Sequence, residues 1–371
     1  MLRGDASSAK LSGVPCPMLF TPLRLGAISV PNRVVMAPLT RQRAGAGDAP
    51  TALNALHYAQ RASAGLIIAE ASQVSPRGKG YVGTPGCHSA EQVSGWRLVT
   101  DAVHAAGGRI LLQLWHAGRR SHPSLLDGQL PICPSAVQPS LPVRLPGGPR
   151  PPPVPHALTL DEIPGVVEDF RIGAANALAA GFDGIELHGA NGYLIEQFLT
   201  DKANHRTDEY GGTRLRFMLD VVAAVTGVWG ADRVGIRFSP FGFANDGGDT
   251  DPEATYGAAI RALDPLGLAF LHLIEPRVSG NTDGDPDAPS VAALFRPFWH
   301  GNLIVAGGFD RAKADAIVAD GTADAVAFGR AYISNPDLME RLRDGVPFSP
   351  YDRSTFYGGG TEGYTDYRVR A

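Results

Sequence analysis

A histidine, an asparagine and a tyrosine stand close together near the middle of the chain. His188, Asn191 and Tyr193 directly follow the apolar run Gly184-Ile185-Glu186-Leu187. Two hydrogen-bond donors next to a phenol can hold an oxygen atom and deliver a proton beside it. The same spacing also fits a histidine that packs in the core without a catalytic role, and the residues alone leave both interpretations open.

Polar residues follow other apolar runs in the same way. The Gln113 amide can both donate and accept hydrogen bonds, which matches the edge of an imide, and Arg237 would stabilise negative charge beside such a ligand. The set holds amide, hydroxyl, imidazole and guanidinium groups rather than clustered carboxylates, so it favours a neutral, planar ligand over a metal ion. These candidates are Thr40, Glu70, Ala71, Gln113, His116, His188, Asn191, Tyr193, Arg237 and Glu275.

Two glycine-containing pairs come after the last two apolar runs. Gly307-Gly308 and Gly329-Arg330 would let backbone N–H groups approach a ligand closely, and Arg330 would add a charged fork. Each pair alone is also typical of an ordinary turn. Their joint position after consecutive strands favours a phosphate site.

Eight short apolar runs predict the strands that would position these residues. Helix-like stretches that end in glycine precede most of them, as at Ala180-Gly181. Strands that are apolar throughout and alternate with helices indicate an α/β fold, a closed (β/α)8 TIM barrel, with a doubly wound open sheet as the alternative. The runs are residues 34–36, 66–68, 110–114, 184–188, 234–238, 268–274, 303–305 and 325–328.

One helix between strands has a clear start signal. Thr159 and Glu162 have the spacing of a capping box, and apolar residues then recur at helical spacing from Ile163 to Ala174. The segment therefore predicts the helix that precedes the fourth strand.

A proline-rich segment separates the third and fourth predicted strands. Residues 131–155 contain ten prolines. A disordered linker between two domains is one interpretation, but neither side of the segment holds a complete set of strands. We expect a long loop that leaves a single barrel near its ligand-binding mouth.

Composition narrows the function classes. The chain has 371 residues, 44% hydrophobic and 19% charged, with a net charge of −4, which provides no electrostatic footprint for nucleic acid or an anionic membrane. Cys16, Cys87 and Cys133 lack the spacing of a disulfide framework or a zinc site. Without an apolar run long enough for a membrane helix or a signal core, the sequence predicts a cytoplasmic enzyme that acts on small molecules.

Three motif-like segments fail on inspection, so we predict no metal site. Residues 45–50 begin like a dinucleotide fingerprint but have proline where the third glycine is needed. Residues 246–251 lack the ligand alternation and terminal glutamate of a calcium loop. His116 and His122 have no further ligand nearby.

Several segments together resemble the Old Yellow Enzyme family of flavin-dependent ene-reductases. The likeness runs from Leu19 to Tyr367. It is carried by residues 32–41 (NRVVMAPLTR), 113–119 (QLWHAGR), 188–199 (HGANGYLIEQFL), 204–212 (NHRTDEYGG), 306–309 (AGGF), 327–330 (AFGR) and 356–360 (FYGGG).

The resemblance implies a tightly but non-covalently bound FMN inside the barrel, reduced by NADPH or NADH. By resemblance, Pro38, Leu39, Thr40 and Ala71 line the isoalloxazine ring, and Gln113 and Arg237 bind its pyrimidine edge. The ribityl phosphate would be held by Ala306, Gly307, Gly308, Gly329 and Arg330.

The resemblance also implies a reaction on activated alkenes. His188 and Asn191 would hold the carbonyl or nitro oxygen of the substrate, its β-carbon would accept hydride, and Tyr193 would protonate the α-carbon from the opposite face. Thr40 would donate a hydrogen bond to the flavin. Trp115 and Tyr357 would shape the substrate pocket.

Rival functions remain at this stage. A barrel lyase or aldolase would need a Schiff-base lysine or a metal, and no lysine follows a predicted strand. A flavin-binding sensor or storage protein with incidental reductase activity stays open. So do the physiological substrate, the choice between NADH and NADPH, and whether the protein is a monomer or a homo-oligomer. Residues 1–18 are expected to form a flexible extension before the barrel of residues 19–371.

Overall fold

A computed structural model describes residues 18–279, 282–285 and 288–368. The extension expected at residues 1–18 lies outside these ranges except for Met18. No helix in the described part of the chain is long and apolar enough to cross a membrane.

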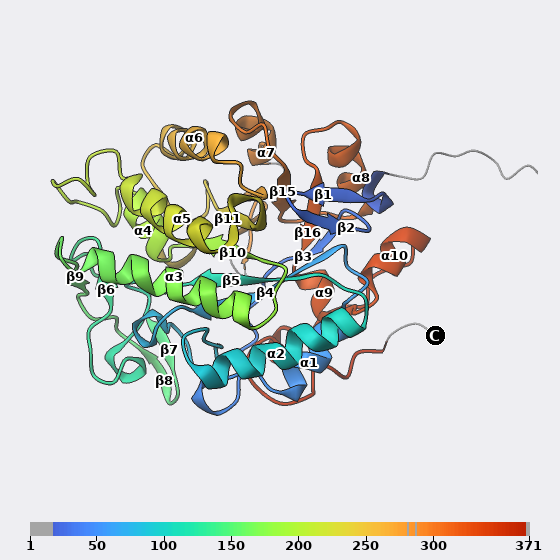
Figure 1. The fold of residues 1–371 in the computed structure, drawn as a ribbon, viewed down its shortest axis with the longest axis horizontal. Coiled ribbons are helices and arrows are strands. Elements are labelled where there is room, and N and C mark those ends of the chain that lie inside the picture. Colours follow the sequence, from blue (N-terminus) through green and yellow to red (C-terminus); the bar gives the residue numbers. More distant parts are fainter. Residues whose placement is uncertain (1–17, 280–281, 286–287, 369–371) are drawn as a thin grey trace, which may run out of the picture.

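Eight parallel strands close into a barrel, which confirms the predicted fold class and shows that the open doubly wound sheet was wrong (Figure 1). All eight neighbouring pairs are parallel. In chain order the strands are β3 (Val34–Met36), β4 (Leu66–Gln73), β5 (Ile110–Trp115), β10 (Gly184–His188), β11 (Val234–Phe238), β12 (Phe270–Ile274), β15 (Leu303–Ala306) and β16 (Ala325–Phe328).

Helices surround this sheet, so the strands are buried on both faces (Figure 1). That is why the strand sequences are apolar almost without interruption. The helices are α1 (Ala52–Ala59), α2 (Ala90–Ala105), α3 (Ile163–Ala179), α4 (Leu194–Leu199), α5 (Arg216–Trp229), α6 (Pro252–Leu263), α7 (Val291–Phe295), α8 (Arg311–Ala319), α9 (Arg330–Ser334) and α10 (Leu338–Asp344).

A short antiparallel hairpin closes the amino-terminal end of the barrel. Its strands are β1 (Leu23–Leu25) and β2 (Ile28–Val30). Leu25 and Ile28 pack with the barrel residues Val35, Leu111 and Phe270 in one buried cluster. The ligand-binding end must therefore be the opposite, carboxyl end of the strands.

The predicted capping box before α3 is only half formed. The Glu162 carboxylate accepts hydrogen bonds from the backbone N–H (2.8 Å) and hydroxyl (3.1 Å) of Thr159. Helical geometry starts at Ile163, with Glu162 as the N-cap, because residues 159–162 form a turn in which Glu162 also contacts His156 at 2.7 Å.

The proline-rich segment is an ordered excursion from the barrel. Within it β7 (Val143–Leu145) and β8 (Gly148–Arg150) form a hairpin, and β6 (Ile132–Cys133) pairs with β9 (His156–Ala157). The strands stay short because proline has no N–H for a ladder. Since β5 and β10 on either side of it are neighbours in the closed sheet, the linker interpretation is wrong.

The hairpin is fastened to the mouth of the barrel by polar contacts. The Arg120 guanidinium donates to the carbonyl oxygen of Leu141 at 2.6 Å. The Asp246 carboxylate accepts from the Ser140 N–H at 2.8 Å and from its hydroxyl at 2.5 Å. These contacts hold the hairpin over the carboxyl end of the strands.

The interior of the barrel is packed too tightly for an extra methyl group at Gly235. A Cβ there would lie 2.2 Å from two ring atoms of the buried Phe270. We predict that Gly235→Ala lowers the free energy of unfolding by roughly 1–3 kcal/mol through overpacking. Gly212→Ala is the control, because its Cβ would meet nothing within 4 Å. Equal urea midpoints for the two variants would contradict the prediction.

Candidate active site

The catalytic candidates lie where β10 meets α4. His188 is the last residue of β10, and Tyr193 is the N-cap of α4. The His188 Nδ1 atom accepts the backbone N–H of Ala190 at 3.3 Å. In a neutral imidazole the other nitrogen then carries the proton, so Nε2 is the donor available to a ligand.

Neighbouring groups keep the His188 imidazole neutral. Burial lowers its pKa well below the usual value, and the positive charge of Arg237 and the neighbouring His272 lower it further. A neutral Nε2–H can hold a substrate oxygen without giving up its proton.

Asn191 is held by its backbone in a left-handed conformation. Its φ is +58°, and the next residue, Gly192, has a φ of +77°. The Asn191 N–H donates to Ser239 Oγ at 2.8 Å, and its carbonyl oxygen accepts from Asn245 Nδ2 at 2.9 Å. Asparagine tolerates this region better than most residues, which suits it to the position.

Tyr193 belongs to an aromatic cluster at the mouth. Its hydroxyl lies 3.0 Å from that of Tyr81. The Tyr193 ring meets Trp115 and His188 edge-on, with centroids 5.1 and 4.9 Å apart, while Tyr81 is stacked on Trp115 at 5.9 Å. Burial, followed by the neighbouring Tyr81, raises the pKa of Tyr193 well above its usual value. The phenol therefore keeps its proton at neutral pH.

Gln113 and Arg237 lie on the barrel's inner surface near His188. Gln113 Nε2 donates to Glu186 Oε1 at 2.8 Å, and the other Glu186 oxygen lies 2.7 Å from His272 Nδ1. One N–H of the Gln113 amide is thus bonded within the protein. The second N–H and the amide oxygen remain for a ligand. Arg237 is only 8% exposed, and its Nε has no partner among the described residues.

The segment after β3 and a bulge in β4 present the other predicted flavin contacts. The pairing of β4 with β5 shifts register between Ala69 and Ser72, and Ala71 stands inside this bulge. Leu39 approaches Gly329, where an added Cβ would lie 3.3 Å from its side chain. Pro38 is buried, whereas Thr40 keeps some exposure.

The two glycine pairs come together at the ends of neighbouring strands. Ala306 ends β15 and pairs with Ala327 of β16, so Gly307-Gly308 and Gly329-Arg330 follow adjacent strands. Gly307 and Gly308 have φ values of +111° and +69°. A Cβ on Gly307 would lie 2.9 Å from the Glu275 carbonyl oxygen.

Two guanidinium groups border these glycines. Arg330 forms an ion pair of 2.5 Å with the exposed Asp283. Arg277, which the sequence analysis missed, donates from Nε to the Gly307 carbonyl oxygen at 3.1 Å, and its Nη2 has no partner within the described ranges. Its position in the sequence could have identified it, because Arg277 stands three residues after β12 and the other candidates were selected because they follow strands.

Trp115 and Tyr357 differ in their burial. Trp115, the last residue of β5, is 1% exposed and packs against Tyr81 and Tyr193. Tyr357 is 41% exposed, and its ring contacts Phe356 edge-on. Arg41 binds the carbonyl oxygens of Phe356 and Gly363 and so ties this carboxyl-terminal segment to the residue after Thr40.

Other candidates from the sequence have internal partners. Glu275 caps α7, where its carboxylate accepts from Ser290 and from two backbone N–H groups. Glu70 accepts the Arg41 N–H at 3.0 Å. His116 Nδ1 accepts the Gly118 N–H at 3.0 Å. Glu70 and Glu275 are thus engaged by the loops around the site, whereas His116 Nε2 has no hydrogen-bond partner among the described residues.

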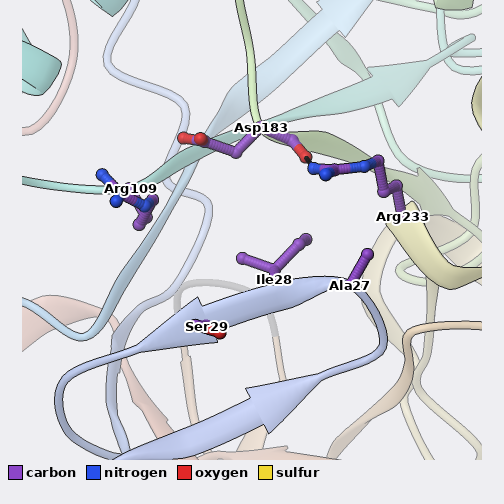
Figure 2. A pocket seen from close by; sticks show the side chains of 6 residues that line it. All are labelled: Ala27, Ile28, Ser29, Arg109, Asp183 and Arg233. Carbon is purple, nitrogen blue, oxygen red and sulfur yellow. Dashed lines mark hydrogen bonds between the residues drawn. The ribbon is translucent and has the colours of Figure 1, made fainter.

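A separate pocket lies at the opposite end of the barrel. Figure 2 shows Arg109, Asp183 and Arg233 facing Ala27 and Ile28 of the amino-terminal hairpin. Arg233 donates to the Asp183 carbonyl oxygen at 2.9 Å, and the Asp183 carboxylate binds a backbone N–H. Barrel active sites lie at the carboxyl ends of strands, so this pocket is not the predicted site.

Known proteins share both the sequence and the architecture of the chain. Residues 18–348 match the model of the NADH:flavin oxidoreductase / NADH oxidase family. The structure of the Old Yellow Enzyme homologue of Zymomonas mobilis is 42% identical with a TM-score of 0.92, covering 95% of this chain and all of that one. The chain belongs to the Old Yellow Enzyme family.

Two further relatives cover nearly the whole chain. 12-Oxophytodienoate reductase 2 of Arabidopsis thaliana is 44% identical, over 94% of this chain and 95% of its own length. The structure of morphinone reductase is 48% identical with a TM-score of 0.90, over 97% and 98% of the two chains. The protein is therefore a flavin oxidoreductase with FMN as cofactor and a reduced nicotinamide as electron donor.

The residues at the strand ends fit FMN. Arg237 Nε and Arg277 Nη2 are buried donors that no group in the described part of the chain satisfies. Such donors are costly unless a ligand accepts their hydrogen bonds. The positive φ of Gly307 and Gly308 leaves backbone exposed where a phosphate group needs N–H donors.

The neutral state of His188 predicts a pH-dependent contribution to stability. Its folded pKa lies below the unfolded value near 6.5, so the contribution is present above about pH 6.5 and is lost as the pH falls towards the folded pKa. We predict that the unfolding free energy of both proteins falls as the solution is acidified. The fall per pH unit should be smaller in His188→Asn than in the wild type, by about 1 kcal/mol. Urea titrations at several pH values measure this, with the exposed His205→Asn as control. Parallel curves for all three proteins would refute the assignment.

Proposed function

We propose that this protein reduces the C=C bond of α,β-unsaturated carbonyl or nitro compounds. The observation that carries the proposal is the grouping of His188, a backbone-fixed Asn191 and Tyr193 within one short segment at the barrel mouth. Two hydrogen-bond donors can polarise an activated alkene and one acid can protonate it, while the hydride comes from the reduced cofactor.

His188 and Asn191 bind the electron-withdrawing oxygen of the substrate. The Nε2–H of a neutral His188 and the Asn191 amide donate to that oxygen and draw electron density from the conjugated double bond. Because the Asn191 backbone is held from both sides, its amide is positioned before the substrate arrives. Preorganised donors of this kind stabilise the negative charge that develops as the alkene is reduced.

Tyr193 supplies the proton. A phenol with a raised pKa does not ionise at neutral pH, yet a developing enolate is basic enough to take its proton. The Tyr81 hydroxyl at 3.0 Å then lies ready to donate to the phenolate that remains. Tyr81 therefore joins the site as a residue that supports the acid.

The remaining site residues hold the cofactor. When bound, FMN supplies the hydride for the β-carbon of the alkene. Pro38, Leu39, Thr40 and Ala71 would line its ring, Gln113 and Arg237 would bind its pyrimidine edge, and Ala306, Gly307, Gly308, Gly329 and Arg330 would hold its phosphate. The buried Arg237 guanidinium would stabilise negative charge on the reduced ring. Trp115 and Tyr357 limit the size of the alkene.

Relatives support a small oxo compound as substrate. The names of 12-oxophytodienoate reductase and morphinone reductase each denote an oxo compound, and one structure of the latter holds tetrahydroNAD. The buried thiols of Cys87 and Cys133 agree with the cytoplasm as the compartment. The reductant is NADH or NADPH.

The oxygen-binding role predicts how Asn191→Ala behaves. Stopped-flow mixing of reduced holoenzyme with 2-cyclohexenone should give rapid, saturable flavin oxidation in the wild type. We expect the variant to need about tenfold more enone for half-saturation, because one hydrogen bond to the substrate oxygen is lost. A sensor or storage protein would show no saturable phase, and an unchanged half-saturation concentration would remove Asn191 from the substrate site.

The proton-donor role predicts a split between the two half-reactions in Tyr193→Phe. We expect flavin reduction by the nicotinamide to stay within about twofold of wild type, while enone reduction slows by roughly 10²–10⁴-fold. Tyr81→Phe is the matched control, since it removes the neighbouring hydroxyl and should slow enone reduction less. Equal losses in both half-reactions of Tyr193→Phe would contradict this role.

A further inference from the structure

Glu196 places a buried carboxylate directly beneath the turn that carries Asn191. It lies on α4 and is fully buried. Its Oε2 accepts the Gly192 N–H at 3.0 Å and the Ser239 hydroxyl at 3.1 Å, and its Oε1 accepts the Gly248 N–H at 3.3 Å. The Tyr256 hydroxyl of α6 also faces this carboxylate. The Gly192, Ser239 and Gly248 groups all donate hydrogen bonds to Glu196, so its carboxylate is placed as an acceptor.

Ser239 connects this carboxylate to the substrate-binding residue. Its hydroxyl donates to Glu196 and accepts the Asn191 N–H at 2.8 Å. Because the proton of Ser239 is directed at Glu196, a lone pair is left for Asn191. The carboxylate therefore orients the hydroxyl that fixes the Asn191 backbone.

A second connection runs through the loop between β11 and α6. Glu196 holds this loop at the Gly248 N–H, and a Cβ on Gly247 would lie 2.8 Å from Glu196 Oε1. The same loop carries Asn245, whose amide donates to the Asn191 carbonyl oxygen. Asn191 is a non-glycine residue at positive φ, and these contacts stabilise its backbone conformation from both sides of the residue.

We propose that Glu196 is a positioning residue of the oxygen-binding turn, residues 190–193, and that its negative charge sets how firmly the turn grips the substrate oxygen. This inference rests on the proposed function. Nothing in it requires Glu196 to touch substrate or cofactor. A protonated Glu196 can no longer accept from every donor around it, so the Ser239 hydroxyl turns and the hold on Asn191 weakens.

The charge of Glu196 changes in the neutral pH range. Burial raises its pKa to about 7, against the opposing effect of the donors from Gly192, Gly248, Ser239 and Tyr256. The other ionisable groups around it are Asp249, which acts on the Tyr256 phenol, and Lys202, which lies near Gly248. Enone binding should therefore tighten as the pH rises through neutrality.

The test compares wild type with Glu196→Gln, a variant of equal shape that carries no charge. Stopped-flow titration of the reduced holoenzymes with 2-cyclohexenone gives the half-saturation concentration between about pH 5.5 and about pH 8.5. We expect the wild-type value to fall about tenfold across this range. The value for Glu196→Gln should stay flat, near the wild-type value at low pH, and the maximal rate should change less than the half-saturation concentration.

Thermal unfolding provides a reading that is independent of activity. The folded pKa of Glu196 lies above the unfolded value of 4.5, so its stabilising contribution is full below about pH 4.5 and is lost as the pH rises through about 7. The melting temperature of the wild type should decline over this interval relative to that of Glu196→Gln.

Controls separate failure of this inference from failure of the proposed function. The Glu340 carboxylate of α10 also accepts a hydrogen bond from a serine hydroxyl, that of Ser63, but lies outside the oxygen-binding turn. Glu340→Gln should therefore keep the wild-type pH profile. If Glu196→Gln fails to bind FMN, Ser239→Ala tests the same connection and should weaken enone binding severalfold. The role of Glu196 is overturned if Glu196→Gln and Ser239→Ala both keep the wild-type half-saturation concentration at every pH while Asn191→Ala is impaired. An unimpaired Asn191→Ala overturns the function on which it rests.

Discussion

The carboxyl ends of eight parallel strands share one rim, and every functional assignment depends on this constraint. Strand closure brings His188 beside Arg237, the residue it pairs with on β11, and Ala306 beside Ala327 on β16. The rim is also where hydrogen-bond donors are left without protein partners, as at Arg237. Buried donors of this kind destabilise the protein unless a ligand accepts from them, so the same geometry that forms the barrel creates the demand for a cofactor.

Electrostatics within the site separates the roles of its residues. Burial and the nearby Arg237 charge keep His188 neutral, so it donates a hydrogen bond without donating its proton. Burial and Tyr81 keep Tyr193 protonated, so the phenol can act as the acid. Two groups five residues apart are thus suited to the different tasks of the proposed reaction, because their surroundings shift their pKa values in opposite directions.

Much of the fold and the principal site could be predicted from the sequence because both follow from local patterns. Strand β10 is apolar throughout and ends in His188, and the glycines after β15 and β16 stand directly in sequence beside their strands. Tyr81, Ser239 and Glu196 could not be predicted as site residues, because their contacts join separate loops. The hydroxyl groups of Tyr81 and Tyr193, for example, meet although the two residues are 112 positions apart. The proline-rich hairpin was located but not described in advance, since its short strands carry no periodic signal.

The central claim is that substrate lies between the cofactor and Tyr193, so that its two new hydrogens arrive on opposite faces. The most direct measurement is reduction of 2-cyclohexenone in D₂O with a reduced nicotinamide deuterated at both C4 positions, followed by NMR of the product. The expected product is trans-2,3-dideuterocyclohexanone, with the deuterium at C2 delivered by Tyr193. A cis product would contradict it, because the proton donor would then lie on the same side of the alkene as the cofactor.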